Sequence, residues 1–238
     1  MKPFVLSLFL ICSHAAHAET LNILTEDYPP YNFKSGSEVR GAATEQIHLI
    51  LKAAGIDYTI EVLPWARAYR LAEKDASSCV YTTGHSAERS GTFKWVEPLL
   101  IDRMVMVRTA QSDARPASVE DAKRFSIGTQ RDDFSEDFLK RNNFPKIDLA
   151  ANFDLTLKKL LGGRLDLMMT SEKTFETMKA AGQPIEAALV LGGRNYGLAC
   201  NLAVSDTAIT RMQAELDRLI ADGTQDRIFA AYGLKPNR

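Results

Sequence analysis

The sequence predicts an α/β protein of two lobes, each a mostly parallel sheet flanked by helices, joined by two hinge strands. Short apolar strands alternate with amphipathic helices along the chain, an order typical of parallel sheets with right-handed crossovers. Two long extended runs without helical periodicity, residues 99–107 and 190–200, interrupt this order. Two such connections allow two lobes to rotate about a cleft, because a few residues at the ends of elements absorb the motion.

The first lobe is predicted to contain three strands and two helices. Its opening strand, 21–25, is a buried apolar run, and residues 28–33 form the loop that follows. A helix over 45–54 has apolar residues at helical spacing and ends at Gly55. The remaining strands are 58–62 and 79–83, with an amphipathic helix between them.

The second lobe repeats the order of strands and helices without visible sequence repetition. Its predicted strands are 125–128 and 165–169, and its predicted helices are 135–142, 156–161 and 172–181. The final stretch, 206–232, has apolar residues at helical spacing and is predicted to pack back on the first lobe. We therefore assign residues 19–103 and 197–238 to lobe 1 and residues 104–196 to lobe 2.

The amino terminus is typical of a secretory leader. Residues 1–18 contain Lys2, an apolar run over 4–12 and the small-residue pattern Ala16-His17-Ala18, which predicts a signal peptide cleaved after Ala18. The apolar run is too short for a permanent membrane span, which needs roughly 20 residues. A lipid anchor on Cys12 is the less favoured alternative, since no small residue stands directly before it. We expect a soluble exported protein.

The charge balance and the cysteines indicate which partners the protein is not expected to bind and whether it forms a disulfide. The chain carries 29 Lys and Arg against 30 Asp and Glu, and without the leader, which holds one of these lysines, the formal charge is −2. This balance does not indicate binding to nucleic acid or to an anionic membrane. Two cysteines outside the leader, Cys79 and Cys200, lie in strand-like runs 121 residues apart. In an oxidising compartment we expect them to form a disulfide, with two buried free thiols as the alternative.

Polar and aromatic side chains cluster between Tyr58 and Leu100, at the ends of two successive predicted strands. An open parallel sheet presents its ligand site at such strand ends. The cluster consists of Pro64-Trp65-Ala66-Arg67, Thr82-Thr83, Gly84 to Arg89 and Phe93 to Pro98.

In order and spacing, these motifs resemble the family-three extracellular solute-binding proteins, the amino-acid-binding type of periplasmic receptor, over nearly all of the mature length. The matching segments are 25–33, 41–47, 86–90, 93–98, 163–166 and 219–224, and 64–68 resembles a divergent branch of the family. The resemblance implies a type II periplasmic-binding-protein fold and a monomeric periplasmic receptor. Such a receptor captures a small-molecule ligand, an amino acid or related organic anion, for an ABC-type permease, without cofactor, metal or catalysis.

The resemblance also implies roles for first-lobe residues. Arg89 matches the arginine that grips a ligand carboxylate, for which a planar guanidinium is suited. Tyr28 and Trp65 match the aromatic residues that sandwich the ligand. Thr82, Thr83 and Gly84 match the segment that meets the ligand's ammonium group. The structural alternatives are an Arg89–Glu88 surface pair and aromatic rings that belong only to the core.

Second-lobe candidates begin with Thr129, Gln130 and Arg131, between a strand and a helix start. Free amides and the helix dipole favour an anion there, and a plain turn is the alternative. Members of the family usually carry an aspartate where this chain has Ser171, with Glu172 beside it.

This departure leaves two explanations open. Either Glu172 replaces the aspartate, or the ligand is not an α-amino acid and Arg67, Arg89 and Arg131 bind a dicarboxylate or another anion. Arg67 could equally pair with Glu45.

Two other functions are weighed against the transport receptor. A sensory partner would present its ligand to a membrane signalling protein. An enzyme similar to cyclohexadienyl dehydratases would use Glu172 as a general acid. The histidines are too few and too scattered to compose a metal site or a nucleophilic triad.

Overall fold

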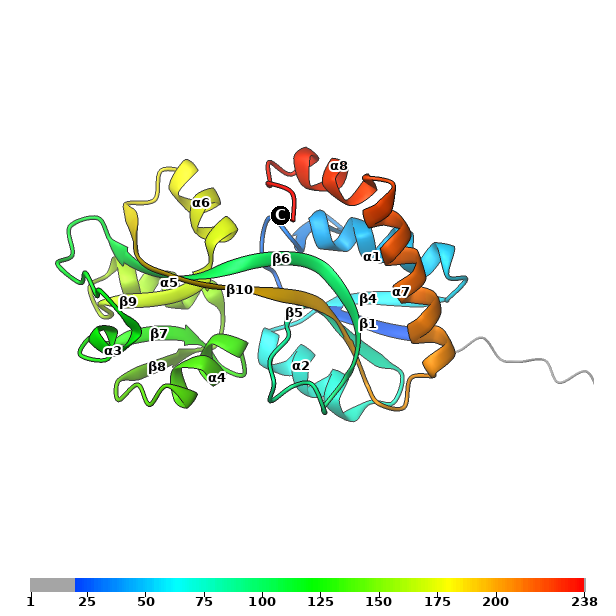
Figure 1. Ribbon diagram of the computed structural model, residues 1–238, viewed down its shortest axis with the longest axis horizontal. Helices are drawn as coiled ribbons and strands as arrows, with labels where there is room; N and C mark the ends of the chain where they lie inside the picture. The colour runs from blue at the N-terminus through cyan, green and yellow to red at the C-terminus, as the bar shows by residue number, and fades with distance from the viewer. Residues whose placement is uncertain (1–19, 238) are drawn as a thin grey trace, which may run out of the picture.

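Two lobes lie side by side and are connected by two long strands (Figure 1). The structure, a computed structural model, describes residues 20–237, so the predicted leader lies outside the described residues. The predicted fold class is confirmed: each lobe holds a parallel sheet portion flanked by helices. None of the helices within residues 20–237 combines the length and the apolar character that crossing a membrane requires.

One sheet of eight strands runs through both lobes in the order β4-β1-β5-β10-β6-β9-β7-β8. In the first lobe β1 pairs in parallel with β4 and β5, and in the second β7 pairs in parallel with β8 and β9. The bounds are β1 (Leu21–Thr25), β4 (Tyr58–Val62), β5 (Ser78–Gly84), β6 (Lys94–Thr109), β7 (Ile127–Gln130), β8 (Ile147–Ala150), β9 (Leu167–Ser171) and β10 (Ile185–Cys200). A separate hairpin consists of β2 (Phe33–Ser35) and β3 (Glu38–Arg40).

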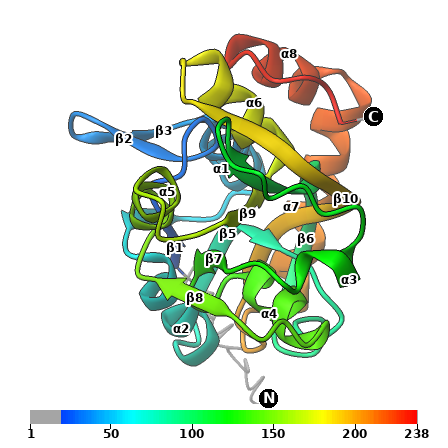
Figure 2. The ribbon, with the colours of Figure 1, turned by 90° about the vertical axis from the view of Figure 1, so that its left-hand side faces the viewer.

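Helices cover the sheet in both lobes. Ile47, Ile50 and Leu51 of α1 and Met212 and Leu216 of α7 are fully buried, because their spacing places them on the helix face that meets the core. Helices α7 and α8 pack on the first lobe, as predicted (Figure 1). Figure 2 looks onto the second lobe, where α4 and α5 flank β7 and β8. The bounds are α1 (Ala42–Ala53), α2 (Trp65–Lys74), α3 (Val119–Ala122), α4 (Phe134–Arg141), α5 (Phe153–Leu161), α6 (Glu172–Ala180), α7 (Asp206–Ala221) and α8 (Thr224–Ala231).

Strands β6 and β10 are the two connections between the lobes. They pair antiparallel along most of their length, so the lobes share a two-stranded ribbon. The register shifts between Val190 and Gly193 and again between Tyr196 and Leu198. The boundaries predicted at 103/104 and 196/197 fall inside these two strands.

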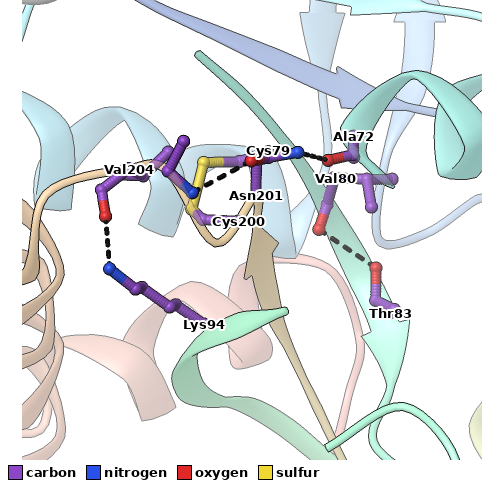
Figure 3. Close-up of a disulfide and its surroundings, with 9 residues drawn as sticks. Ala72, Cys79, Val80, Thr83, Lys94, Cys200, Asn201 and Val204 are labelled. Carbon is purple, nitrogen blue, oxygen red and sulfur yellow. Dashed lines mark hydrogen bonds between the residues drawn. A yellow bond between two sulfur atoms is a disulfide. The ribbon is translucent and has the colours of Figure 1, made fainter. Parts of the chain in front are cut away.

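The first lobe contains the disulfide between Cys79 of β5 and Cys200 of β10 (Figure 3). Both cysteines are fully buried and stand opposite each other in the antiparallel register. The adjacent Asn201 side chain donates to the carbonyl oxygen of Ala72 at 3.0 Å, and Lys94 Nζ donates to that of Val204 at 2.8 Å. The chain therefore passes from the first lobe into the second along β6 and returns along β10. The disulfide then joins the end of β10 to β5 of the first lobe.

Three short elements were not predicted: the β2–β3 hairpin, α3 and the edge strand β8. Each has only three or four residues, too few for a clear period in the sequence. β6 also begins at Lys94, earlier than the predicted hinge run at 99, because its first residues pair with the end of β10 inside the first lobe.

Candidate ligand-binding site between the lobes

An enclosed cavity lies where the two lobes meet, and we call it the interlobe cavity. The first lobe and β10 contribute Glu26, Tyr28, Thr82 and Tyr196. The second lobe contributes Thr129, Gln130, Asp133, Phe134, Ser135, Phe153, Thr156, Met169, Thr170 and Ser171. The space open to the centre of a water-sized sphere is about 30 Å³, enough for roughly two water molecules. The lobes are thus closely apposed, and a solute enters only when they move apart.

Aromatic rings form two walls of the cavity. Tyr28 of the first lobe meets Phe153 of the second edge to face, with ring centres 5.3 Å apart. Phe134 and Tyr196 meet in the same way at 5.4 Å. The Tyr196 side chain is 4% exposed, and its hydroxyl has no hydrogen-bond partner among residues 20–237. An unpaired buried hydroxyl is costly, so this group is available to a ligand.

Two carboxylates face the cavity, Glu26 directly after β1 and Asp133 at the start of α4. Of the described residues that line the cavity, these two are the charged ones. Gln130 Nε2 donates to Glu26 Oε2 at 2.6 Å, a bond between the lobes. Asp133 Oδ1 caps α4 by accepting from the Ser135 backbone N–H at 2.8 Å.

Burial shifts both acids toward the neutral form. It raises the pKa of Glu26 to about 8, with the hydrogen bond from Gln130 opposing this and the negative charges of Asp133 and Asp27 adding to it. Burial likewise raises the pKa of Asp133, and the positive charge of Arg89 opposes the rise. The cavity therefore holds two acids that a positive charge would return to the ionised form.

Hydroxyl groups complete the lining. Tyr28 Oη of the first lobe lies 3.0 Å from Thr170 Oγ1 and 3.4 Å from Ser171 Oγ of the second lobe, so these hydroxyl groups connect the two lobes. Thr82 has a φ of 58°, a left-handed conformation that is rare for a β-branched residue, and its hydroxyl donates to Asn32 Oδ1 at 2.6 Å. Such conformations cost energy and occur preferentially at ligand sites.

Beside the cavity, five residues form a contact between the lobes that we call the interlobe latch: Trp65, Arg70, Arg89, Asp132 and Asp137. The backbone carbonyl of Asp132 accepts from Trp65 Nε1 at 2.9 Å and from Arg89 Nη2 at 2.8 Å. Arg70 pairs with the Asp132 carboxylate at 2.9 Å, and Arg89 Nε donates to Asp137 at 3.0 Å. Basic side chains of the first lobe thus hold acidic residues of the second.

Predicted site residues fall into three groups. Tyr28, Thr82, Thr129, Gln130 and Ser171 line the interlobe cavity. Trp65 and Arg89 belong to the latch, while Thr83 and Gly84 are buried beside the cavity. Arg67 and Arg131 are exposed, and Glu172 is bonded to Arg103 at 2.5 Å, with none of these three lining the cavity.

The roles assigned to these residues stay predictions. In the Arg89 guanidinium, Nε and Nη2 are paired with the second lobe, and the buried Nη1 has no hydrogen-bond partner within residues 20–237. The alternative pairs do not form: Glu88 is bonded to Arg141, and Glu45 accepts from the Tyr232 hydroxyl.

Sequence reasoning missed several cavity residues, chiefly Glu26, Asp133, Phe134, Phe153 and Tyr196. Glu26 follows the first strand directly, the position at which a parallel sheet presents side chains to a ligand, so a signal for it existed. Asp133 and Phe134 begin a helix and Phe153 begins another, and only the packed lobes show which helix starts face the cleft.

An open groove, which we call the entrance groove, shares Glu26 and Phe153 with the interlobe cavity. Its volume is about 400 Å³. The charged residues along it are Glu26, Asp27, Lys34 and Asp154, and Trp65 lies at its wall.

Comparison with known proteins agrees with this architecture. The chain is similar to ArtJ from Geobacillus stearothermophilus, an arginine-, lysine- and histidine-binding protein, at 17% identity and a TM-score of 0.80, covering 91% of this chain and 96% of that one. It is also similar to a histidine kinase sensor domain that resembles periplasmic binding proteins, at 18% identity and a TM-score of 0.82, covering 91% and 98%.

A further similar structure is an ancestral amino-acid-binding protein, a precursor of cyclohexadienyl dehydratase, at 18% identity and a TM-score of 0.77, covering 90% of this chain and 95% of that one. At these identities the likeness concerns the fold. No curated protein matches the chain. The sequence family does match, over residues 21–235. The chain belongs to the bacterial extracellular solute-binding proteins of family 3.

Proposed function

We propose that this protein is a periplasmic receptor that captures a small polar solute between its lobes and passes it to an ABC-type permease of the inner membrane. The observation that carries the proposal is the interlobe cavity, whose lining comes from both lobes and combines aromatic rings with polar groups. Bonds that cross it, such as Gln130 to Glu26, form only when the lobes are together. Solute capture and lobe closure are therefore coupled. The protein works as a monomer, without cofactor or chemical conversion of the solute.

Export to the periplasm follows from the predicted leader and fits the disulfide between Cys79 and Cys200. The enzymatic alternative needs Glu172 as its acid, and that carboxylate is bonded to Arg103 away from the cavity. We therefore favour binding over catalysis.

A thermal-shift screen of amino acids, dicarboxylates and amines tests the proposal on the mature protein. A solute at 100 times its dissociation constant adds roughly 2.7 kcal/mol to the free energy of unfolding. We expect at least one solute to give a saturable rise in melting temperature and a smaller radius of gyration in small-angle scattering. If no member of any class changes either quantity, the receptor proposal is wrong.

A further inference from the structure

We propose that the interlobe cavity selects a small organic cation, a protonated amine without a carboxylate, an inference that rests on the proposed function and names its ligand class. The charged side chains facing the cavity in the described chain, Glu26 and Asp133, are both acidic, and each comes from a different lobe. A cation placed between them would be attracted by both lobes at once.

The acceptor atoms of the cavity match an ammonium group. Glu26 uses Oε2 to accept from Gln130, and Asp133 uses Oδ1 to accept from Ser135. Each acid has a second carboxylate oxygen besides the one that accepts these bonds, and the buried Tyr196 hydroxyl has no hydrogen-bond partner within residues 20–237. These three oxygen atoms equal in number the three N–H donors of a primary ammonium group.

The aromatic walls favour the same ligand class. Tyr28, Phe134, Phe153 and Tyr196 surround the polar groups, and aromatic rings attract cations through their negative faces. They also offer apolar contact for a short hydrocarbon chain. The cavity as it stands has room for roughly two water molecules, so such a molecule would fit only with the lobes moved further apart.

Among residues 20–237 no basic side chain lines this cavity. Arg89 belongs to the latch, where Nε and Nη2 donate to Asp137 and to the Asp132 carbonyl and the buried Nη1 has no partner within the described chain, while Arg67 and Arg131 lie on the exposed surface. A bound anion would face Glu26 and Asp133 instead, and above the pKa of Glu26, where this acid is ionised, the like charges repel. In the entrance groove Asp27, Asp154 and Glu26 outnumber Lys34, which favours the approach of cations.

Four-carbon probes that differ only in charge test this inference by calorimetry and thermal shift at pH 8.5 and low salt: butylamine, γ-aminobutyrate and butyrate. We expect butylamine to bind and to raise the melting temperature, γ-aminobutyrate to bind at least tenfold more weakly, and butyrate to have no effect. Glu26→Gln and Asp133→Asn should each weaken butylamine binding at least tenfold, and both keep the shape of the side chain. Asparagine also preserves the cap of α4. Glu186→Gln, which removes an exposed carboxylate paired with Lys179 in the second lobe, is the matched control and should bind like the parent protein.

The pH dependence supplies a second measurement. Asp133, Asp27 and Gln130 act on Glu26, and Lys34 and Asp154 lie along the adjoining groove. With the pKa of Glu26 at about 8, a cation that binds only the ionised acid should bind roughly twentyfold more tightly at pH 8.5 than at pH 6.5. Glu26→Gln should reduce this dependence to what the titration of Asp133 contributes.

The outcomes separate the ligand class from the receptor function. If carboxylate-bearing probes bind as well as butylamine, and Arg89→Ala abolishes their binding, the cation inference is wrong and the receptor proposal stands. If butylamine fails to bind while another solute of the wider screen does, the inference is likewise wrong. If no solute binds at all, both fail together.

Discussion

The interlobe latch and the interlobe cavity lie side by side, yet they use charge in opposite ways. In the latch, Arg70 and Arg89 of the first lobe meet Asp132 and Asp137 of the second, so each charge has an opposite partner. In the cavity, Glu26 and Asp133 face each other's lobe without a basic residue on the cavity wall. Within residues 20–237 the latch pairs its charges and leaves one buried donor, Arg89 Nη1, without a hydrogen-bond partner, whereas the two acids of the cavity have no opposite charge on its wall.

Breaking the latch should give the largest effect. Arg89→Ala removes a buried guanidinium and leaves Asp137, whose side chain is 32% exposed, without its ion pair. We expect the free energy of unfolding to fall by about 2 kcal/mol, less than for a fully buried pair because solvent reaches Asp137. Urea unfolding measures the loss, and small-angle scattering should show a more open protein.

Arg141→Ala is the control for the latch, because Arg141 bonds to Glu88 across the lobes at an exposed position. Exposed pairs contribute about 0–1 kcal/mol, so this change should be almost silent. Equal losses from the two substitutions would show that the latch has no special role in closure.

Adding a methyl group at the rim of the cavity should have an intermediate effect. A Cβ built on Gly84 of β5 would lie 2.6 Å from the Phe134 ring of the second lobe. Gly84→Ala should therefore disfavour the closed arrangement by about 1.5 kcal/mol, because overpacking costs roughly 1–3 kcal/mol when side chains must shift. Scattering should report a larger radius of gyration.

Gly91→Ala is the matched control for Gly84→Ala, since a Cβ there meets no atom of residues 20–237 within 4 Å. A radius of gyration that is the same for both variants would contradict the close approach of Gly84 and Phe134.

Removing the charge of Glu26 should give the smallest effect, and one that depends on pH. Its pKa is about 8 in the folded protein against an ordinary 4.5, so the folded state binds more protons between these values. The free energy of unfolding therefore falls as pH rises from about 4.5 to about 8. Glu26→Gln should stabilise the protein by about 1 kcal/mol at pH 9, or 2–4 °C in melting temperature, and change little at pH 4.5. A gain of equal size at both values would mean that Glu26 is not held neutral by burial.

Much of the fold was predictable because periodicity reports burial. The parallel strands β1, β4 and β5 and the apolar faces of α1 and α7 are visible in the sequence, and each forms where it was expected. The edge strand β8 was missed, since four residues, the first three of them half-buried, carry no clear pattern.

The site was harder to predict, because motifs identify residues without showing what each will contact. Arg67 stands in a conspicuous motif, but α2 buries Trp65, Ala68 and Tyr69, so Arg67 projects from the exposed face. Arg89 is indeed at the cleft, yet its guanidinium is bonded to second-lobe acids that no motif connects with it. Tertiary pairing between the lobes decides which charges remain available to a ligand.

The bond between Cys79 and Cys200 also determines where the molecule can bend. Cys200 is the last residue of β10, so the covalent link anchors one end of the two-stranded ribbon to the first lobe. The register of β10 against β6 is interrupted between Val190 and Gly193, so we expect the ribbon to bend there and not at its bonded end. Because β10 also pairs with β5 from Tyr196 to Cys200, reduction should loosen this end without detaching it, and the ribbon would then guide the rotation of the lobes less firmly.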